Sequence, residues 1–146
     1  MEIKKKVWLS FAICVSLLAP NIGVAMADEV VKVALVGESM EKMGIKLDRE
    51  SVKAGTITFQ VTNEAMKTGH EMIVVKLESK DQTFPIIASS KRVDEKALRS
   101  LGEVSNLKPG AQGTLTAMLK PGDYMLICNI KGHYQAGMYT HLSVTN

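Results

Sequence analysis

The sequence has a small net charge, and it contains few cysteines and few histidines. Its 146 residues carry 18 basic and 15 acidic side chains, which leaves a formal net charge of only +3. A balance so close to neutrality gives no reason to expect a nucleic acid or an anionic surface as partner. The chain also lacks a low-complexity linker, and its length suits one ordinary domain. Cysteine occurs twice, at Cys14 and Cys128, and what these thiols do depends on the compartment of the protein.

The amino terminus predicts export. Three lysines near the start precede the apolar run VWLSFAICVSLLA, and Ala25–Ala27 offers a small-residue cleavage site. This three-part pattern is typical of a secretory signal peptide. We therefore expect residues 1–27 to be removed, and residues 28–146 to form one periplasmic domain without a membrane attachment. An uncleaved anchor is the alternative, because the weakly polar run continues to Ala27. Cleavage would leave one cysteine in the mature chain.

The remaining chain has the pattern of strands separated by turns. Alternating and β-branched runs favour strands, and Pro-Gly in the two LKPG segments favours tight turns. Residues 79–92 resemble an irregular loop, and residues 94–102 resemble a short helix that Asp94 caps and Gly102 ends. Short strands with frequent turns predict an all-β fold, a Greek-key β-sandwich with one short helix in a long connection. The expected strands are 30–37, 45–47, 56–62, 70–78, 111–119, 123–128 and 138–146.

The segment CNIKGHYQAGM, residues 128–138, spaces three possible metal donors evenly. Cys128, His133 and Met138 follow one another at intervals of five residues, between the last two expected strands. A single thiol in an exported protein is a buried small side chain, an intermolecular bridge, a nucleophile or a metal ligand. His70 begins another strand, and it would meet Cys128 and His133 if both strand junctions lie at one end of the sandwich. Two imidazoles and a thiolate with a weak axial thioether form the ligand set of blue-copper sites.

These motifs resemble the cupredoxin family of blue copper proteins. PGDYMLICNIKGHYQAGM resembles the carboxy-terminal signature of azurins, plastocyanins, rusticyanins and sulfocyanins, and VKAGTITFQVTNE followed by GHEMIVV resembles the upstream half of the pattern. The spacing of four residues between Cys and His, and again between His and Met, is most similar to rusticyanin and sulfocyanin. The resemblance spans residues 30–146. It implies one copper ion bound by His70, Cys128 and His133, with Met138 as the axial ligand.

By this resemblance, the expected function is a periplasmic carrier of single electrons, and not an enzyme. The protein would cycle copper between Cu(I) and Cu(II) as a monomer that docks weakly on redox partner proteins near His133. Tyr134, Ala136 and Gly137 suit a small apolar patch at that place. The alternative is a copper-binding protein for copper tolerance, delivery or storage that uses the same ligands.

Two further classes fit the sequence less well. An oxidase or a nitrite reductase needs additional copper centres, which three histidines in total cannot supply. A cysteine nucleophile with a histidine base is chemically possible, but it would leave Met138 without a role.

The sequence departs from the family pattern at two positions beside the expected ligands. Glu71 stands where many members place Asn or Ser after the first histidine, and Lys131 lies in a loop where many have a proline. A buried or half-buried carboxylate beside the metal would favour Cu(II), and an additional backbone N–H near the sulfur would stabilise the thiolate. Since neighbouring groups tune a metal strongly, we expect a reduction potential in the low or middle part of the family range. Asn129 is expected to tie the ligand loops together instead.

Overall fold

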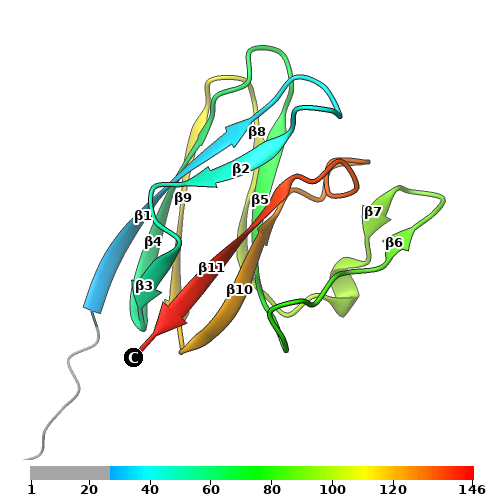
Figure 1. Cartoon of the computed structure of the whole chain (residues 1–146). Helices are drawn as coiled ribbons and strands as arrows, with labels where there is room; N and C mark the ends of the chain where they lie inside the picture. The colour runs from blue at the N-terminus through cyan, green and yellow to red at the C-terminus, as the bar shows by residue number, and fades with distance from the viewer. Residues whose placement is uncertain (1–26) are drawn as a thin grey trace, which may run out of the picture.

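The computed structural model describes residues 27–146, which form two packed β-sheets and one small hairpin (Figure 1). The predicted signal peptide lies outside the described residues apart from Ala27, and its cleavage stays a prediction. The fold is all-β, as the strand and turn pattern predicted. Within residues 27–146, no helix has the length and apolar composition needed to cross a membrane.

The first sheet has the strand order β2-β1-β4-β9. It consists of β1 (Ala27–Val36), β2 (Gly44–Leu47), β4 (Gly55–Asn63) and β9 (Gln112–Leu119). Strand β1 pairs with β4 in parallel, while β2 and β9 pair antiparallel with their neighbours. Side chains of β4 alternate between buried and less buried positions, as a strand with one face on a core requires.

The second sheet has the order β3-β11-β10-β5-β8 and carries the functional end of the molecule. Its strands are β3 (Ser51–Lys53), β5 (His70–Lys76), β8 (Ser100–Leu107), β10 (Gly122–Ile127) and β11 (Tyr139–Thr145). Strand β10 pairs antiparallel with both β5 and β11. The beginning of β5, the end of β10 and the beginning of β11 therefore lie at the same end of the sheet.

The main core lies between the two sheets. It combines the inward-facing residues of β1 and β4 with those of β5, β10 and β11, and it includes both Cys128 and Met138. Apolar area removed from water in this way contributes about 25 cal/mol per Å² to the stability of the fold. The largest fully buried members are Leu35, Ile57, Phe59, Met72, Leu119, Tyr124, Leu126, Met138 and Leu142.

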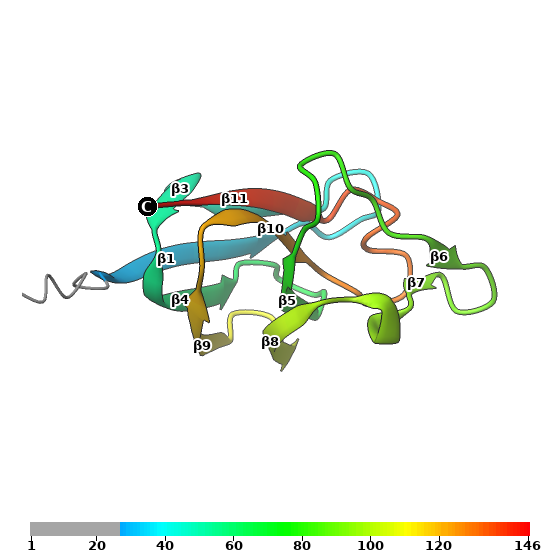
Figure 2. The same ribbon diagram turned by 90° about the horizontal axis from the view of Figure 1, so that it is seen from below.

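A second core covers the outer face of the second sheet. Strand β5 is buried on both of its faces, and its outer residues pack under the connection that leads from β5 to β8. This connection contains a hairpin of β6 (Ile86–Ile87) and β7 (Arg92–Val93), which projects beyond the sandwich in Figure 2. The buried members of this core are Ile73, Val75, Leu77, Phe84, Val93, Met125, Ile127 and Tyr134.

The connection differs from the sequence-based expectation in two ways. Residues 79–92 are not wholly irregular, because they contain β6 and the start of β7. The side chain of Asp94 accepts a hydrogen bond from the Lys96 N–H as an N-cap does, but only a 3-10 turn, η1 (Glu95–Ala97), follows. Pairing with β5 then draws the chain into β8. Local helix signals are a weak prior that such tertiary pairing overrides.

Candidate metal centre

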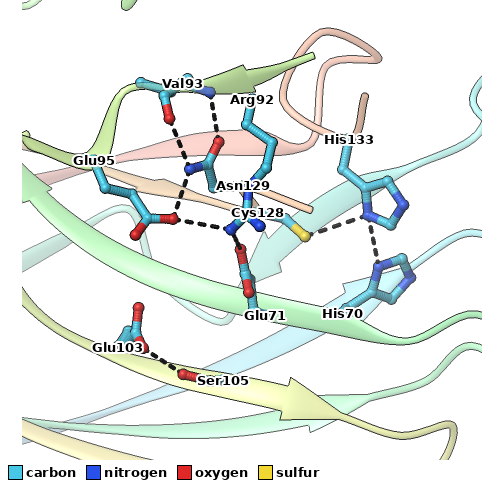
Figure 3. Close-up of polar contacts among 10 residues, drawn as sticks. All are labelled: His70, Glu71, Arg92, Val93, Glu95, Glu103, Ser105, Cys128, Asn129 and His133. Atoms are coloured by element: carbon cyan, nitrogen blue, oxygen red, sulfur yellow. Dashed lines mark hydrogen bonds and ion pairs between the residues drawn. The ribbon is translucent and has the colours of Figure 1, made fainter. Parts of the chain in front are cut away.

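Three donor side chains converge at the end of the second sheet where β5 begins and β10 ends. His70 is the first residue of β5, Cys128 follows the last residue of β10, and His133 lies on the connection to β11 (Figure 3). One donor atom from each residue lies within 4.8 Å of the others. The Nδ1 atom of His133 lies 3.3 Å from the Cys128 Sγ atom and 3.3 Å from the His70 Nδ1 atom.

The cluster is closed off from water. His70 and Cys128 are completely buried, and His133 keeps only 5% of its surface exposed. The Nδ1 atoms of His70 and His133 and the Sγ atom of Cys128 face one another inside it at hydrogen-bond distances. A soft or borderline cation can bind all three atoms at once, because thiolate and imidazole are donors that copper prefers. The donor set therefore fits one copper ion.

A backbone carbonyl fixes the orientation of the His70 ring. The Nε2 atom lies 3.0 Å from the carbonyl oxygen of Gly37. A carbonyl accepts only, so Nε2 carries the hydrogen and Nδ1 presents its lone pair to Cys128 and His133. Metal-binding histidines are commonly held in this way by a partner on the second ring nitrogen. The Gly37 carbonyl comes from the end of β1, so the first sheet orients a donor that belongs to the second.

Burial sets the protonation states of the donors without metal. It lowers the pKa of His70, and burial together with the neighbouring His70 lowers the pKa of His133 to about 4. Burial also raises the pKa of the Cys128 thiol to about 11, although the backbone N–H groups of Glu71 and Ile130 act in the opposite direction. Both imidazoles are therefore neutral and ready to bind at neutral pH, while the thiol must first lose its proton.

The loop between Cys128 and Met138 is closed by its own backbone. The Cys128 N–H donates to the Met138 carbonyl at 3.0 Å, and the Met138 N–H donates to the His133 carbonyl at 3.0 Å. Gly132 and Gly137 adopt φ values of +83° and +87°, which are accessible to glycine without steric cost. Met138 is completely buried in the same cluster as Cys128. The closure of the loop thus pairs the backbone of the predicted axial residue with that of Cys128.

Two residues that the sequence did not single out shape the loop before His70. The fully buried Asn63 donates to the carbonyls of Thr68 and Leu107, both at 2.9 Å. Its side-chain oxygen accepts from the Ala65 N–H at 3.0 Å. The only local sign of this role was an Asn where a strand turns into a loop, a position at which Asn side chains commonly bond to the backbone.

Glu38 supports the same loop from the segment after β1. Its carboxylate accepts hydrogen bonds from the backbone of Met66 and Lys67 and from the Thr68 hydroxyl. These hydrogen bonds lower the pKa of Glu38, and the bond from the Met66 N–H has the largest effect. Together they outweigh desolvation, which raises the pKa, so the pKa lies below its usual value. Nothing in the sequence links residues this far apart, so no sequence signal could have found the contact.

Glu71 and Asn129 take part in a polar network on the other side of the thiol (Figure 3). Glu71 is buried, and its Oε1 atom has no hydrogen-bond partner among residues 27–146 but lies 3.8 Å from the Arg92 guanidinium. Burial raises the pKa of Glu71, with Arg92 acting against that change. Asn129 does tie the ligand loop down, but its side chain bonds to Val93 at the hairpin and to Glu95, not to the loop before His70.

The surface around His133 differs from the expected apolar patch. Tyr134 is buried in the second core, and its hydroxyl accepts a hydrogen bond from the Phe84 N–H at 3.1 Å. It therefore adds nothing to an exposed patch, while Ala136 is half-buried and Gly137 is exposed. His141 is exposed and outside the cluster, as the alternation of β11 predicted.

Comparison with known proteins gives a family and a fold. A sequence model of the sulfocyanin (SoxE) domain matches residues 31–146. No curated protein matches the chain.

Among solved structures, the chain is similar to a dithionite-reduced auracyanin from Roseiflexus castenholzii, with 20% identity over 83% of this chain and 99% of that one, and a TM-score of 0.57. It is also similar to rusticyanin from Thiobacillus ferrooxidans, with 15% identity over 80% and 76% of the two chains and a TM-score of 0.58. Auracyanin A from Chloroflexus aurantiacus, described as a blue copper protein, shares 18% identity over 82% and 100%, with a TM-score of 0.57. These likenesses show a common fold.

Proposed function

We propose that this chain, which belongs to the sulfocyanin family of blue copper proteins, carries single electrons between partner proteins by cycling one copper ion between Cu(I) and Cu(II). The observation that carries the proposal is the buried cluster of His70, Cys128 and His133, whose donor atoms lie within 4.8 Å of one another. These three residues would bind the copper, with the buried Met138 as a weak axial ligand. Copper bound by such donors supplies one-electron chemistry without a bound substrate.

The way the chain holds these donors suits electron transfer. The Gly37 carbonyl orients the ring of His70, and the backbone bonds between Cys128 and Met138 close the loop that carries His133. Donors held by the protein itself move little when the charge of the metal changes. Because the donors move little, the reorganisation energy of each electron transfer is low, and a low reorganisation energy favours rapid electron exchange.

The same burial supports a carrier of electrons over a protein that hands copper to others. A delivery protein needs donors that an acceptor can reach, whereas His70 and Cys128 have no exposed surface. His133 alone retains slight exposure, so we place the docking of redox partners beside it. We further propose that the protein acts in the periplasm after removal of residues 1–27, as a monomer and without enzymatic activity of its own.

A titration of the purified protein with Cu(II) tests this function. An intense thiolate-to-copper absorption band should saturate at one equivalent and be absent from Cys128→Ser. The copper form should then be reduced and reoxidised through several cycles without loss of metal. Tight binding of Cu(I) alone, with a weak band or none, would instead identify a protein for copper delivery or storage.

A Met138→Leu variant tests the axial position. The absorption band should persist, because the thiolate and both imidazoles remain, but the reduction potential should rise because an electron donor to Cu(II) is lost. Met125→Leu is the matched control, since Met125 is equally buried but lies in the second core. Equal potentials for the two variants would remove Met138 from the coordination sphere.

A further inference from the structure

We propose that the β6–β7 hairpin is a clamp that holds the copper loop in position, with Asn129 and Tyr134 as the positioning residues through which it acts. The proposal rests on the proposed function in that the clamped loop is the one that would bind copper. In Figures 1 and 2, the loop between β10 and β11 lies beside the hairpin, although the hairpin contributes no donor atom.

Asn129 is bonded to both backbone groups of one hairpin residue. Its Oδ1 atom accepts from the Val93 N–H at 2.7 Å, and its Nδ2 atom donates to the Val93 carbonyl at 3.0 Å. The same Nδ2 donates to the Glu95 carboxylate at 2.9 Å. Asn129 is completely buried, and its two bonds to Val93 are buried as well, so water does not compete for them. A side chain paired with the backbone of β7 thus fixes the residue directly after Cys128.

Two further contacts join the hairpin to the opposite side of the same loop. The Gly132 N–H donates to the Lys91 carbonyl at 2.8 Å, one residue before His133. One residue after His133, the Tyr134 hydroxyl accepts from the Phe84 N–H at 3.1 Å. His133 is therefore held from both flanks by bonds to the connection that contains the hairpin.

The hairpin itself is firmly anchored, which a clamp requires. Val93 and Phe84 are buried in the second core against the outer side chains of β5 and β10. The Phe84 ring also packs against the ring of Tyr134, with 6.3 Å between their centroids. Arg92 reaches the buried Glu71 carboxylate at 3.8 Å, beside His70. The clamp consequently contacts the segments of all three donors.

The composition of the copper loop explains why an external clamp is needed. The segment NIKG between Cys128 and His133 has no proline, ends in a glycine and contains the exposed Lys131. Such a segment has many backbone conformations available in isolation. Fixing its two ends from the hairpin removes this freedom before any metal arrives, and this would keep donor movement small during electron transfer.

Two tyrosines provide a matched test. Tyr134→Phe removes a hydroxyl that accepts the Phe84 N–H at 3.1 Å. Tyr124→Phe removes one that accepts the Lys120 N–H at the same distance and also donates to the Lys120 carbonyl at 2.7 Å. Both rings are buried, but Tyr124 belongs to the main core, away from the hairpin. Tyr124→Phe should lose at least as much stability as Tyr134→Phe, but only Tyr134→Phe should change the copper loop.

Hydrogen–deuterium exchange on the metal-free variants gives a readout that does not depend on copper. In Tyr134→Phe and in Asn129→Ser, amides of residues 129–137 should exchange about tenfold faster than in the parent protein, with β1 and β4 unchanged. The Cu(II) affinity should fall about tenfold, as is typical when groups that orient metal ligands are removed. Electron self-exchange in the copper form should slow as well, whereas Tyr124→Phe should leave all three quantities unchanged.

The outcomes separate the clamp from the proposed function. Parent-like loop exchange and Cu(II) affinity in Tyr134→Phe would overturn the clamp, even if Asn129→Ser failed to fold. A parent protein without the thiolate-to-copper band would overturn the proposed function, and the exchange experiment on metal-free protein would still decide the clamp. Faster loop exchange in Tyr124→Phe to the same degree would also overturn it, because the effect would then follow from lost stability alone.

Discussion

Replacing Asn63 with serine should weaken copper binding through the loop that carries His70. Asn63 is completely buried, and its side chain makes three hydrogen bonds to the backbone of Ala65, Thr68 and Leu107. Serine is too short to reach these groups together. The variant would leave the Leu107 carbonyl and the Ala65 N–H without this partner in the interior, and the Thr68 carbonyl without it at a partly buried position.

The expected loss follows from this count. A buried polar group without a partner costs about 1–3 kcal/mol, so the two interior groups alone should lower the free energy of unfolding by about 2 kcal/mol at the lower end of that range. This loss applies to the metal-free and the copper form alike. A looser loop should also lower the Cu(II) affinity about tenfold, which corresponds to about 1.4 kcal/mol. With Cu(II) in excess, the copper form should lose that additional amount.

Urea unfolding of both forms, together with a competition titration for Cu(II), measures these quantities. Thr58→Val is the control on the same strand, since it removes only an exposed hydrogen bond to the Thr116 hydroxyl. If Asn63→Ser destabilised the two forms equally and changed the Cu(II) affinity less than twofold, Asn63 would not position His70. The reasoning about the loop would then be refuted.

Three predictions concern charge at the site. The pKa of Cys128 (about 11) lies above pH 7 and that of His133 (about 4) lies below it. Binding of Cu(II) at pH 7 should therefore release about one proton, that of the thiol. Calorimetry in buffers of different ionisation enthalpy measures this number, and a release of no proton or of two protons would contradict the prediction. The lowered pKa of His133 also means that the unfolded chain binds more protons, so the metal-free protein should lose stability as the pH falls from about 6.5 to 4. Glu71→Gln should raise the reduction potential at pH 8, because it removes a negative charge beside the thiolate, and voltammetry that gave the same potential as the surface control Glu78→Gln would disprove the idea.

The sequence could predict β1, β2, β4, β5, β9, β10 and β11, because the pattern of each of these strands is local, but it did not predict β3, β8 or the hairpin. Residues of β4 alternate between the core and the outside as the sequence does, and the apolar run of β5 is buried on both faces. The helix over 94–102 was wrong beyond its first turn. Asp94 caps that turn as predicted, but the pairing of β8 with β5 depends on distant residues.

In the metal centre, too, the features set by neighbouring residues could be predicted, and those set by residues far apart in the sequence could not. The spacing of Cys128 and His133 belongs to one short loop, and the sequence could place His70 at the head of a strand. The supports of these donors could not be predicted, because Glu38 and Asn63 act through the meeting of separate loops. Asn129 was expected to tie loops together, but its partner Val93 lies directly after residues 79–92, which the sequence presented as irregular.

The pairing of β5 with β10 links the copper site to the order in which the protein folds. His70 begins one strand and Cys128 follows the other, and the two strands are neighbours although β6 to β9 lie between them in the chain. Contacts between segments so distant in sequence form slowly, since a long loop must close first. A chain that has not yet joined these strands has no complete place for the metal. The blue absorption band should therefore develop only after β5 and β10 have paired, and its appearance would report on that step of folding.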